Sequence, residues 1–123
     1  MGETRVVARI HGPDGHADVE MLADTGATLT LVPESVAKSV GIQQEGSVKV
    51  RLADGRIRSL PVGRAEIELR GDRAPIRVII GSGSVALLGL TALETLGLKV
   101  NPVERRLEPS VFNQFSLASP VVS

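Results

Sequence analysis

The stretch LADTGATLTLV, residues 22–32, decides the expected fold of this chain. It places an aspartate, a threonine and a glycine between an apolar segment and the alternating run TLTLV, which is typical of a short β-strand. Burying a carboxylate at the end of an apolar strand is costly unless something offsets the charge. Asp24, Thr25 and Gly26 therefore form either an ordinary turn, with the Asp side chain bonded to the backbone two residues on, or a catalytic centre.

Short strands joined by tight turns are expected on both sides of this stretch. GPDG, residues 12–15, is a turn signal, and Asp54-Gly55 is a strong signal for a two-residue hairpin. Pro61 has no amide hydrogen for a strand ladder, so the segment after residue 60 is expected to be an edge or a bulge. The expected strands span residues 6–10, 18–22, 28–32, 47–53, 56–60, 65–69, 76–80 and 84–90.

Two short helices are expected between the strands. Pro33 suits the first position of a helix, and Gly41 supplies a stop. Thr91 and Glu94 have the spacing of a capping box, with Gly97 as the following stop. The chain is therefore expected to be mainly β, with a small helical share. The two predicted helices span residues 33–40 and 92–96.

Composition limits the possible functions. The chain has 123 residues, which fits one domain; we expect it to span residues 1–108, followed by a tail, 109–123, that is either an interface strand or disordered. The chain has two Phe, no Tyr and no Trp, so a site that stacks nucleic-acid bases is not expected. The net charge of zero gives no attraction to polyanions. The absence of cysteine excludes disulfides and thiolate metal sites.

The location of the protein is expected to be cytoplasmic. The first residues, MGETRVVARIHG, lack the pattern of a signal peptide. The chain also has no apolar run long enough to span a bilayer. We therefore expect no membrane and no nucleic-acid partner.

Two weaker patterns in the sequence resemble sites of other kinds, a metal site and a dinucleotide-binding loop. His11 and His16 flank one turn, but their spacing fits no zinc site, so surface histidines and no metal are expected. Gly81-x-Gly83-x-x-Ala86 follows an apolar strand and imitates a dinucleotide fingerprint. A dinucleotide-binding unit needs a long helix and a second parallel strand after the glycines, and too few residues remain for them.

Four motifs, taken in order, resemble those of the retropepsin-like aspartic proteases, the single-domain relatives of pepsin. They are DTGAT between two apolar strands, the hairpin LADGR, the strand pair AEIELRG and IRVIIG, and LLG followed by LTALETLGLKVNP. The resemblance covers about residues 17–107. The chain is most similar to small stand-alone members from bacteria and archaea, which carry similar LADG and LLGLxALExLGL stretches.

The resemblance implies a retropepsin-like acid-protease β-barrel with one or two short helices, assembled as a homodimer. Hydrolysis at an aspartic site needs two carboxylates about 3 Å apart that share one proton. This chain has a single Asp-Thr-Gly and is too short for the two-lobed plan of pepsin. The catalytic Asp24 is therefore expected to face its own copy across a two-fold axis.

The residues around Asp24 receive supporting roles from the same resemblance. Thr25 is expected to turn its hydroxyl inward and brace the pair, and Ala27 to line the cleft. Gly26 lets two backbones approach closely because it has no Cβ. The segment expected to hold the Asp24 loop is Leu87, Leu88 and Gly89.

The hairpin tip formed by Ala53, Asp54 and Gly55 is the candidate flap. Under the resemblance it closes over substrate, excludes water and bonds to an extended peptide. This tip is more polar than the glycine-rich flap of retroviral members.

We accordingly predict an aspartic endopeptidase that acts on peptide or unfolded-protein substrates with no metal or organic cofactor. Its subsites should be apolar and aliphatic, given the residues available to line them. The alternative is a catalytically silent module for dimerisation or peptide binding, because a fold does not prove a function. The intact Asp-Thr-Gly favours catalysis.

Overall fold

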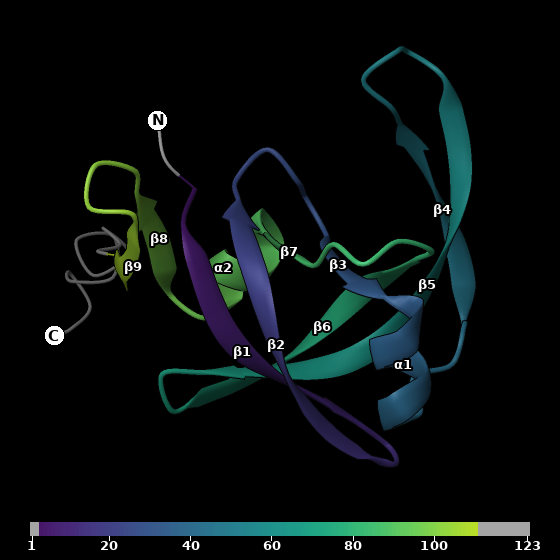
Figure 1. Ribbon diagram of the computed structural model, residues 1–123, viewed down its shortest axis with the longest axis horizontal. Helices are drawn as coiled ribbons and strands as arrows, with labels where there is room; N and C mark the ends of the chain where they lie inside the picture. The colour runs from purple at the N-terminus through teal and green to yellow at the C-terminus, as the bar shows by residue number, and fades with distance from the viewer. Residues whose placement is uncertain (1–2, 111–123) are drawn as a thin grey trace, which may run out of the picture.

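The computed structural model describes residues 3–110 of the chain, which form a β-barrel with two short helices. Figure 1 shows the barrel with a hairpin extending from one side and a small two-stranded sheet on the other. The elements are β1 (Arg5–Gly12), β2 (Gly15–Asp24), β3 (Thr30–Pro33), α1 (Glu34–Val40), β4 (Gly46–Arg51), β5 (Ile57–Leu69), β6 (Asp72–Gly81), β7 (Leu87–Gly89), α2 (Leu90–Thr95), β8 (Leu98–Asn101) and β9 (Arg106–Pro109).

Six strands close the barrel, because β1 pairs with both β2 and β5. The order around the barrel is β1-β2-β7-β3-β6-β5. The strand β4 lies outside this ring, at the end of the sheet, and pairs with the first part of β5. The β4–β5 hairpin therefore extends beyond the barrel (Figure 1). The mainly β class and the β-barrel with two short helices predicted from the sequence are confirmed.

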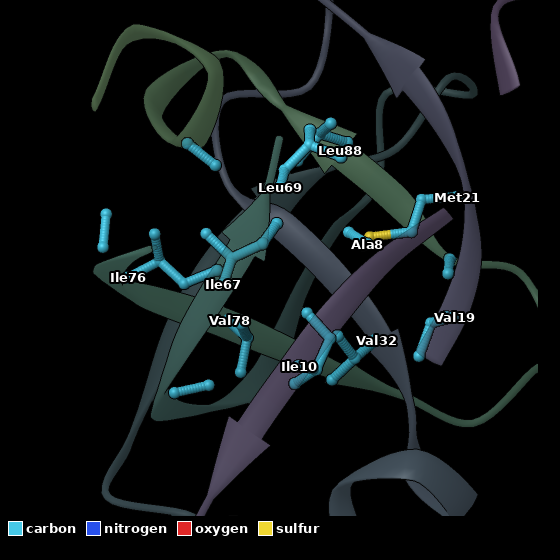
Figure 2. Packing of buried hydrophobic residues seen from close by; sticks show 14 of the residues in the cluster. Ala8, Ile10, Val19, Met21, Val32, Ile67, Leu69, Ile76, Val78 and Leu88 are labelled. Atoms are coloured by element: carbon cyan, nitrogen blue, oxygen red, sulfur yellow. The ribbon is translucent and has the colours of Figure 1, made fainter. Parts of the chain in front are cut away.

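The core fills the barrel with aliphatic side chains from facing strands (Figure 2). Alternation along each strand sends every second residue inward, so Ile10, Met21, Ile67 and Val78 are fully buried. Each such side chain contributes about 1.5 to 3 kcal/mol by leaving water. The alternating sequence therefore accounts for the barrel without aromatic residues.

In the barrel, the short strand β7 lies between β2 and β3, although β2 and β3 follow each other in the sequence. It runs parallel to the end of β2, with Asp24 opposite Gly89, and antiparallel to β3, with Leu31 opposite Leu87. The loop from Asp24 to Thr30 consequently bridges over β7. This insertion brings a segment from late in the chain against the loop that carries Asp24.

The two helices differ in how well the sequence predicts their starts. Helix α1 begins at Glu34 with Pro33 just before it, and it ends at Gly41, whose φ of 81° is left-handed. The capping box predicted for the second helix is wrong. Helix α2 begins at Leu90, its N-cap is Gly89, and no side chain caps it. Backbone carbonyls of the Asp24 loop replace the predicted cap, as described below.

The long strand β5 corrects two further predictions. Segments 56–60 and 65–69 were expected as separate strands, but β5 is continuous across Pro61. Pro61 is tolerated because β5 exchanges partners there, from β4 up to Val62 to β6 from Val62 onward. The preceding turn has three residues, not two: Leu52 and Arg56 are bonded, with a N–O distance of 2.7 Å, and Gly55 has a φ of 88°.

The strands β8 and β9 were not predicted. They pair antiparallel from Leu98 opposite Pro109 to Asn101 opposite Arg106. The boundary predicted at residue 108 stays a prediction, and the rest of the expected tail, residues 111–123, lies outside the described residues. No helix within residues 3–110 is long and apolar enough to cross a membrane.

Candidate active site

Asp24 is the last residue of β2 and lies where the strand leaves the barrel wall. Its Oδ1 accepts a hydrogen bond from the Gly26 amide at 2.8 Å, and its carbonyl accepts one from the Ala27 amide at 3.1 Å. The turn signal in the sequence is therefore real. Asp24 is exposed in the single chain, so the buried charge suggested by the apolar flanks does not arise within one subunit.

The loop after Asp24 is fastened to the start of helix α2 by two backbone hydrogen bonds. The Leu90 amide donates to the Ala27 carbonyl at 2.7 Å, and the Thr91 amide donates to the Thr28 carbonyl at 3.1 Å. These two bonds satisfy amides at the first turn of α2 that have no partner inside the helix. The loop and the helix consequently stabilise each other.

A further bond behind the loop comes from Thr30, which was not among the predicted site residues. Its hydroxyl accepts the Gly89 amide at 3.1 Å, and the residue is only 1% exposed. A threonine at an inward position of an alternating strand was the available signal, because a buried hydroxyl needs a partner. Thr30 therefore joins β3 to β7 directly behind the Asp24 loop.

Two glycines, Gly89 and Gly26, lie where other atoms of this loop come close to the position of a Cβ. A Cβ on Gly89 would lie 2.6 Å from the carbonyl carbon and oxygen of Leu29. A Cβ on Gly26 would lie 3.1 Å from the Asp24 Oδ1. Any side chain at residue 89 would push the loop outward, and one at residue 26 would crowd the carboxylate.

The segment expected to support Asp24 lies beside it. Leu87, Leu88 and Gly89 form β7, which pairs in parallel with the last three residues of β2. Leu88 is fully buried and belongs to the core cluster shown in Figure 2. Thr25 and Gly26 are exposed at the apex of the loop, and Ala27 is half-buried.

A cleft of about 620 Å³ lies between the Asp24 loop and the β4–β5 hairpin. The loop contributes residues from Gly26 to Leu29, and β4 contributes residues from Val48 to Arg51. Asp24 itself borders a second hollow of about 290 Å³ on the other side of its loop, and Leu87 lines both. The apolar side chains of the larger cleft are Ala27, Leu29, Leu31, Val48, Val50, Leu60, Ile79 and Leu87.

The predicted flap residues lie at the tip of the hairpin, away from the cleft wall. Ala53, Asp54 and Gly55 are all exposed, and the residues that line the cleft come from the hairpin's two arms instead. The Asp54 carboxylate accepts bonds from the Arg56 amide at 2.9 Å and from the Arg56 side chain at 2.6 Å. The tip is therefore held by its own charges.

His11 and His16 lie opposite each other on the β1–β2 hairpin and are not among the residues that line this cleft. His16 is exposed, whereas the His11 side chain is 15% exposed and bonds to Glu68 at 2.7 Å, so His11 is less superficial than expected. The hydrogen bond from His11 lowers the pKa of Glu68 below its ordinary value. Within residues 3–110 no cluster of His, Cys, Asp and Glu could hold a metal ion.

The dinucleotide pattern lacks the structure that its chemistry needs. Gly81 ends β6, Gly83 lies in the following loop, and Ala86 is buried immediately before β7. The helix that follows, α2, has 6 residues and begins only after β7. A phosphate-binding helix therefore does not follow the glycines.

Comparison with known proteins places this site in a family context. A sequence model of the family described as "gag-polyprotein putative aspartyl protease" matches residues 12–95, which include the Asp24 loop, the β4–β5 hairpin and β7. No curated protein sequence matches the chain.

Two solved viral proteases share the fold. The EIAV protease in complex with the inhibitor HBY-793 matches with a TM-score of 0.67 and 17% identity, over 81% of this chain and 93% of that one. The protease of simian foamy virus (mac) in solution matches with a TM-score of 0.52 and 20% identity, over 75% of this chain and 93% of that one. At these identities the likeness establishes the retropepsin-like fold.

Proposed function

The chain belongs to the gag-polyprotein aspartyl protease family, and from this premise we propose that it is an aspartic endopeptidase acting through a dyad of Asp24 and its copy in a second subunit. The observation that carries the proposal is the position of Asp24. Its carboxylate is exposed, and Oδ1 is held by the Gly26 amide at 2.8 Å. Its loop also forms one wall of an apolar cleft of about 620 Å³.

The need for a second subunit follows from the chemistry and the sequence together. The reaction uses two carboxylates, and the chain contains one Asp-Thr-Gly. A two-fold axis next to Asp24 supplies the second group from an identical loop. The exposed apex at Thr25 and Gly26 leaves room for that approach. We propose that Thr25 braces the paired loops through its hydroxyl, because Thr25 directly follows Asp24 and is exposed in one chain.

The proposed reaction is direct attack of water on the peptide carbonyl. The ionised carboxylate takes a proton from water as the water oxygen bonds to the carbonyl carbon, while the protonated carboxylate donates to the carbonyl oxygen. The tetrahedral gem-diol then breaks its C–N bond: the carboxyl that took the proton from water gives it to the leaving nitrogen, and the other carboxylate takes a proton from one hydroxyl, which releases a carboxylic acid and an amine and restores the dyad. Because the two groups share one proton, activity depends on the pair and falls on both sides of an acidic optimum.

The proposed substrate is an extended peptide with aliphatic side chains. The cleft has room for several side chains, and its lining is dominated by Leu, Val and Ile. Residues from both arms of the β4–β5 hairpin line it on one side. We propose that this hairpin acts as the flap, with Ala53, Asp54 and Gly55 at its tip.

The test of catalysis is cleavage of unfolded protein or peptide libraries from about pH 3 to 7. Asp24→Asn should lower kcat/KM by about a thousandfold or more, because it removes both members of the dyad at once. Circular dichroism and thermal unfolding serve as folding controls for the variant. Equal cleavage by the wild type and the folded variant at every pH would refute the proposal and leave the alternative of a silent binding module.

A mixing experiment tests the shared dyad separately. When wild type and Asp24→Asn subunits exchange freely at equal amounts, only about half of the wild-type subunits remain in active pairs. Activity per wild-type subunit should therefore fall to about half, and further with excess variant. Unchanged activity would show that one chain is sufficient. Light scattering under the same conditions gives the oligomeric state.

A further inference from the structure

The β4–β5 hairpin carries an excess of positive charge that the rest of the chain does not share. Residues 46–60 contain Lys49, Arg51, Arg56 and Arg58 but only one carboxylate, Asp54. The whole chain has 14 basic and 14 acidic residues, so this excess is local.

Three of these cations have no carboxylate partner within residues 3–110. Asp54 is bonded to Arg56, with 2.6 Å between Oδ2 and Nε. The remaining cations, Lys49, Arg51 and Arg58, lie within ion-pair distance of no described carboxylate. We call these three side chains the basic hairpin. Half of the chain's Lys and Arg residues are paired with carboxylates, and three of the others lie together on this one hairpin.

The basic hairpin lies at the edge of the apolar cleft. Lys49 and Arg51 line the cleft together with Val48 and Val50, and these two cations are its only charged lining residues among those described. Arg58 is opposite Val50 in the strand register and therefore shares the face of that cleft residue. Lys49 and Arg51 alternate with Val48 and Val50 along β4, so their exposed side chains start from the other face, at the rim of the cleft. An extended peptide in the cleft would thus have its aliphatic side chains among Leu and Val, with Arg58 beside Val50 and with Lys49 and Arg51 at the rim.

We propose that the basic hairpin selects peptides in which acidic residues flank an aliphatic segment. The inference rests on the proposed function only in that the cleft accepts an extended peptide. Carboxylates of the substrate would supply the partners that the hairpin cations lack. A nucleic acid would also offer negative charge, but the cleft wall is aliphatic and has no aromatic side chain for a base to stack on.

The experiment compares three fluorescein-labelled peptides of about eight residues, each with a central Leu-Val pair flanked on both sides by Glu, by Gln or by Lys. Binding to Asp24→Asn is followed by fluorescence anisotropy, and cleavage by the wild type is followed by chromatography. One exposed ion pair changes affinity by about twofold to fivefold, so three cations should favour the Glu peptide over the Gln peptide by about tenfold. The preference should shrink as salt is raised.

Two variants of equal net charge locate the effect. Lys49→Gln, Arg51→Gln and Arg58→Gln together neutralise the basic hairpin. The control combines Arg77→Gln, Lys99→Gln and Arg105→Gln, three exposed cations outside the cleft that also lack a carboxylate within ion-pair distance. The hairpin variant should bring the Glu to Gln ratio close to one, and the control variant should retain the wild-type ratio.

The outcomes separate this inference from the proposed function. Tighter binding of the Glu peptide that only the hairpin variant abolishes supports the inference, even if the wild type cleaves nothing. Measurable cleavage of all three peptides at equal rates would overturn the inference and leave the protease proposal intact. Loss of the preference in both variants would assign it to net charge and overturn it too. Tighter binding of a single-stranded oligonucleotide, equal in charge to the Glu peptide, would also overturn the inference.

Discussion

The Asp24 loop and the β4–β5 hairpin form opposite walls of one cleft, yet they are held in different ways. The loop is fastened by backbone and side-chain bonds to β7 and α2, segments about 60 residues further along the chain. The hairpin is held mainly by its own two strands and extends beyond the barrel (Figure 1). A carboxylate that must meet its copy closely needs a fixed support, whereas a wall that admits a peptide does not. The comparison predicts that equivalent substitutions have unequal effects in the two regions.

The largest effect should come from the support of the loop. Gly89→Ala places a methyl group 2.6 Å from the Leu29 backbone, so the loop must shift, and we expect a loss of about 3 kcal/mol of unfolding free energy. Urea unfolding measures this loss. Gly83→Ala is the matched control, because a Cβ there meets nothing within 4 Å. Similar losses for the two variants would show that the loop is not closely packed on β7.

Removal of one buried hydroxyl should have the next largest effect. Thr30→Val keeps the shape of the side chain but leaves the Gly89 amide without its acceptor, which lies at 3.1 Å. An unsatisfied buried amide costs about 2 kcal/mol, and cleavage should weaken in parallel. Thr30→Ser retains the hydroxyl and should recover most of the activity in the same peptide assay. If the valine variant proved as active and stable as wild type, the role given to Thr30 would be incorrect.

The hairpin tip should be more tolerant. Gly55 has a φ of 88°, where a side chain is strained but meets nothing within 4 Å, so Gly55→Ala should reduce stability by only about 1 kcal/mol. Gly46→Ala, in open space without a positive φ, is the control. Urea unfolding and peptide cleavage should both be measured. A loss equal to that of Gly89→Ala would remove the contrast between the two regions.

The smallest effect concerns the hydrogen bond between His11 and Glu68, which lies outside both regions. It indicates how stability itself changes with pH in the acid range used for cleavage assays. The pKa of Glu68 is depressed below its ordinary value of 4.5 by the hydrogen bond from His11. A depressed carboxyl pKa adds stability above the unfolded-state pKa, and this stability is lost as the pH falls through the folded-state pKa. Glu68→Gln should therefore weaken the acid dependence of unfolding below about pH 4.5. Urea midpoints across this range, for wild type and variant, provide the measurement.

Local signals predicted much of the fold. The strand pair on either side of RGDRAP was predicted, but the turn is tighter than expected: β6 begins at Asp72 instead of residue 76, after Arg70 and Gly71, which both have positive φ. Alternation identified the strands because inward and outward residues differ in any half-buried strand. The strands β8 and β9, of 4 residues each, were not predicted.

The errors share a physical cause. The capping box of Thr91 and Glu94 is a good local signal, but the Thr91 amide finds the Thr28 carbonyl, a partner that is distant in sequence. Pro61 looked like a strand boundary because the sequence does not show that β5 continues past it and pairs with β6 from Val62 onward. In both cases a tertiary hydrogen bond or pairing replaced the partner expected from nearby residues.

The sequence alone determined the β class, the position of Asp24 at a strand end and the hairpin that faces it. These properties depend on residues close together in the chain, whose alternation and turn chemistry are visible in one dimension. Only the tertiary structure decided what holds the Asp24 loop, namely Thr30, Gly89 and the first turn of α2. It also assigned the cleft wall to the arms of the hairpin instead of its tip. Backbone partners across long sequence separations are chosen by the closure of the barrel, which no local pattern encodes.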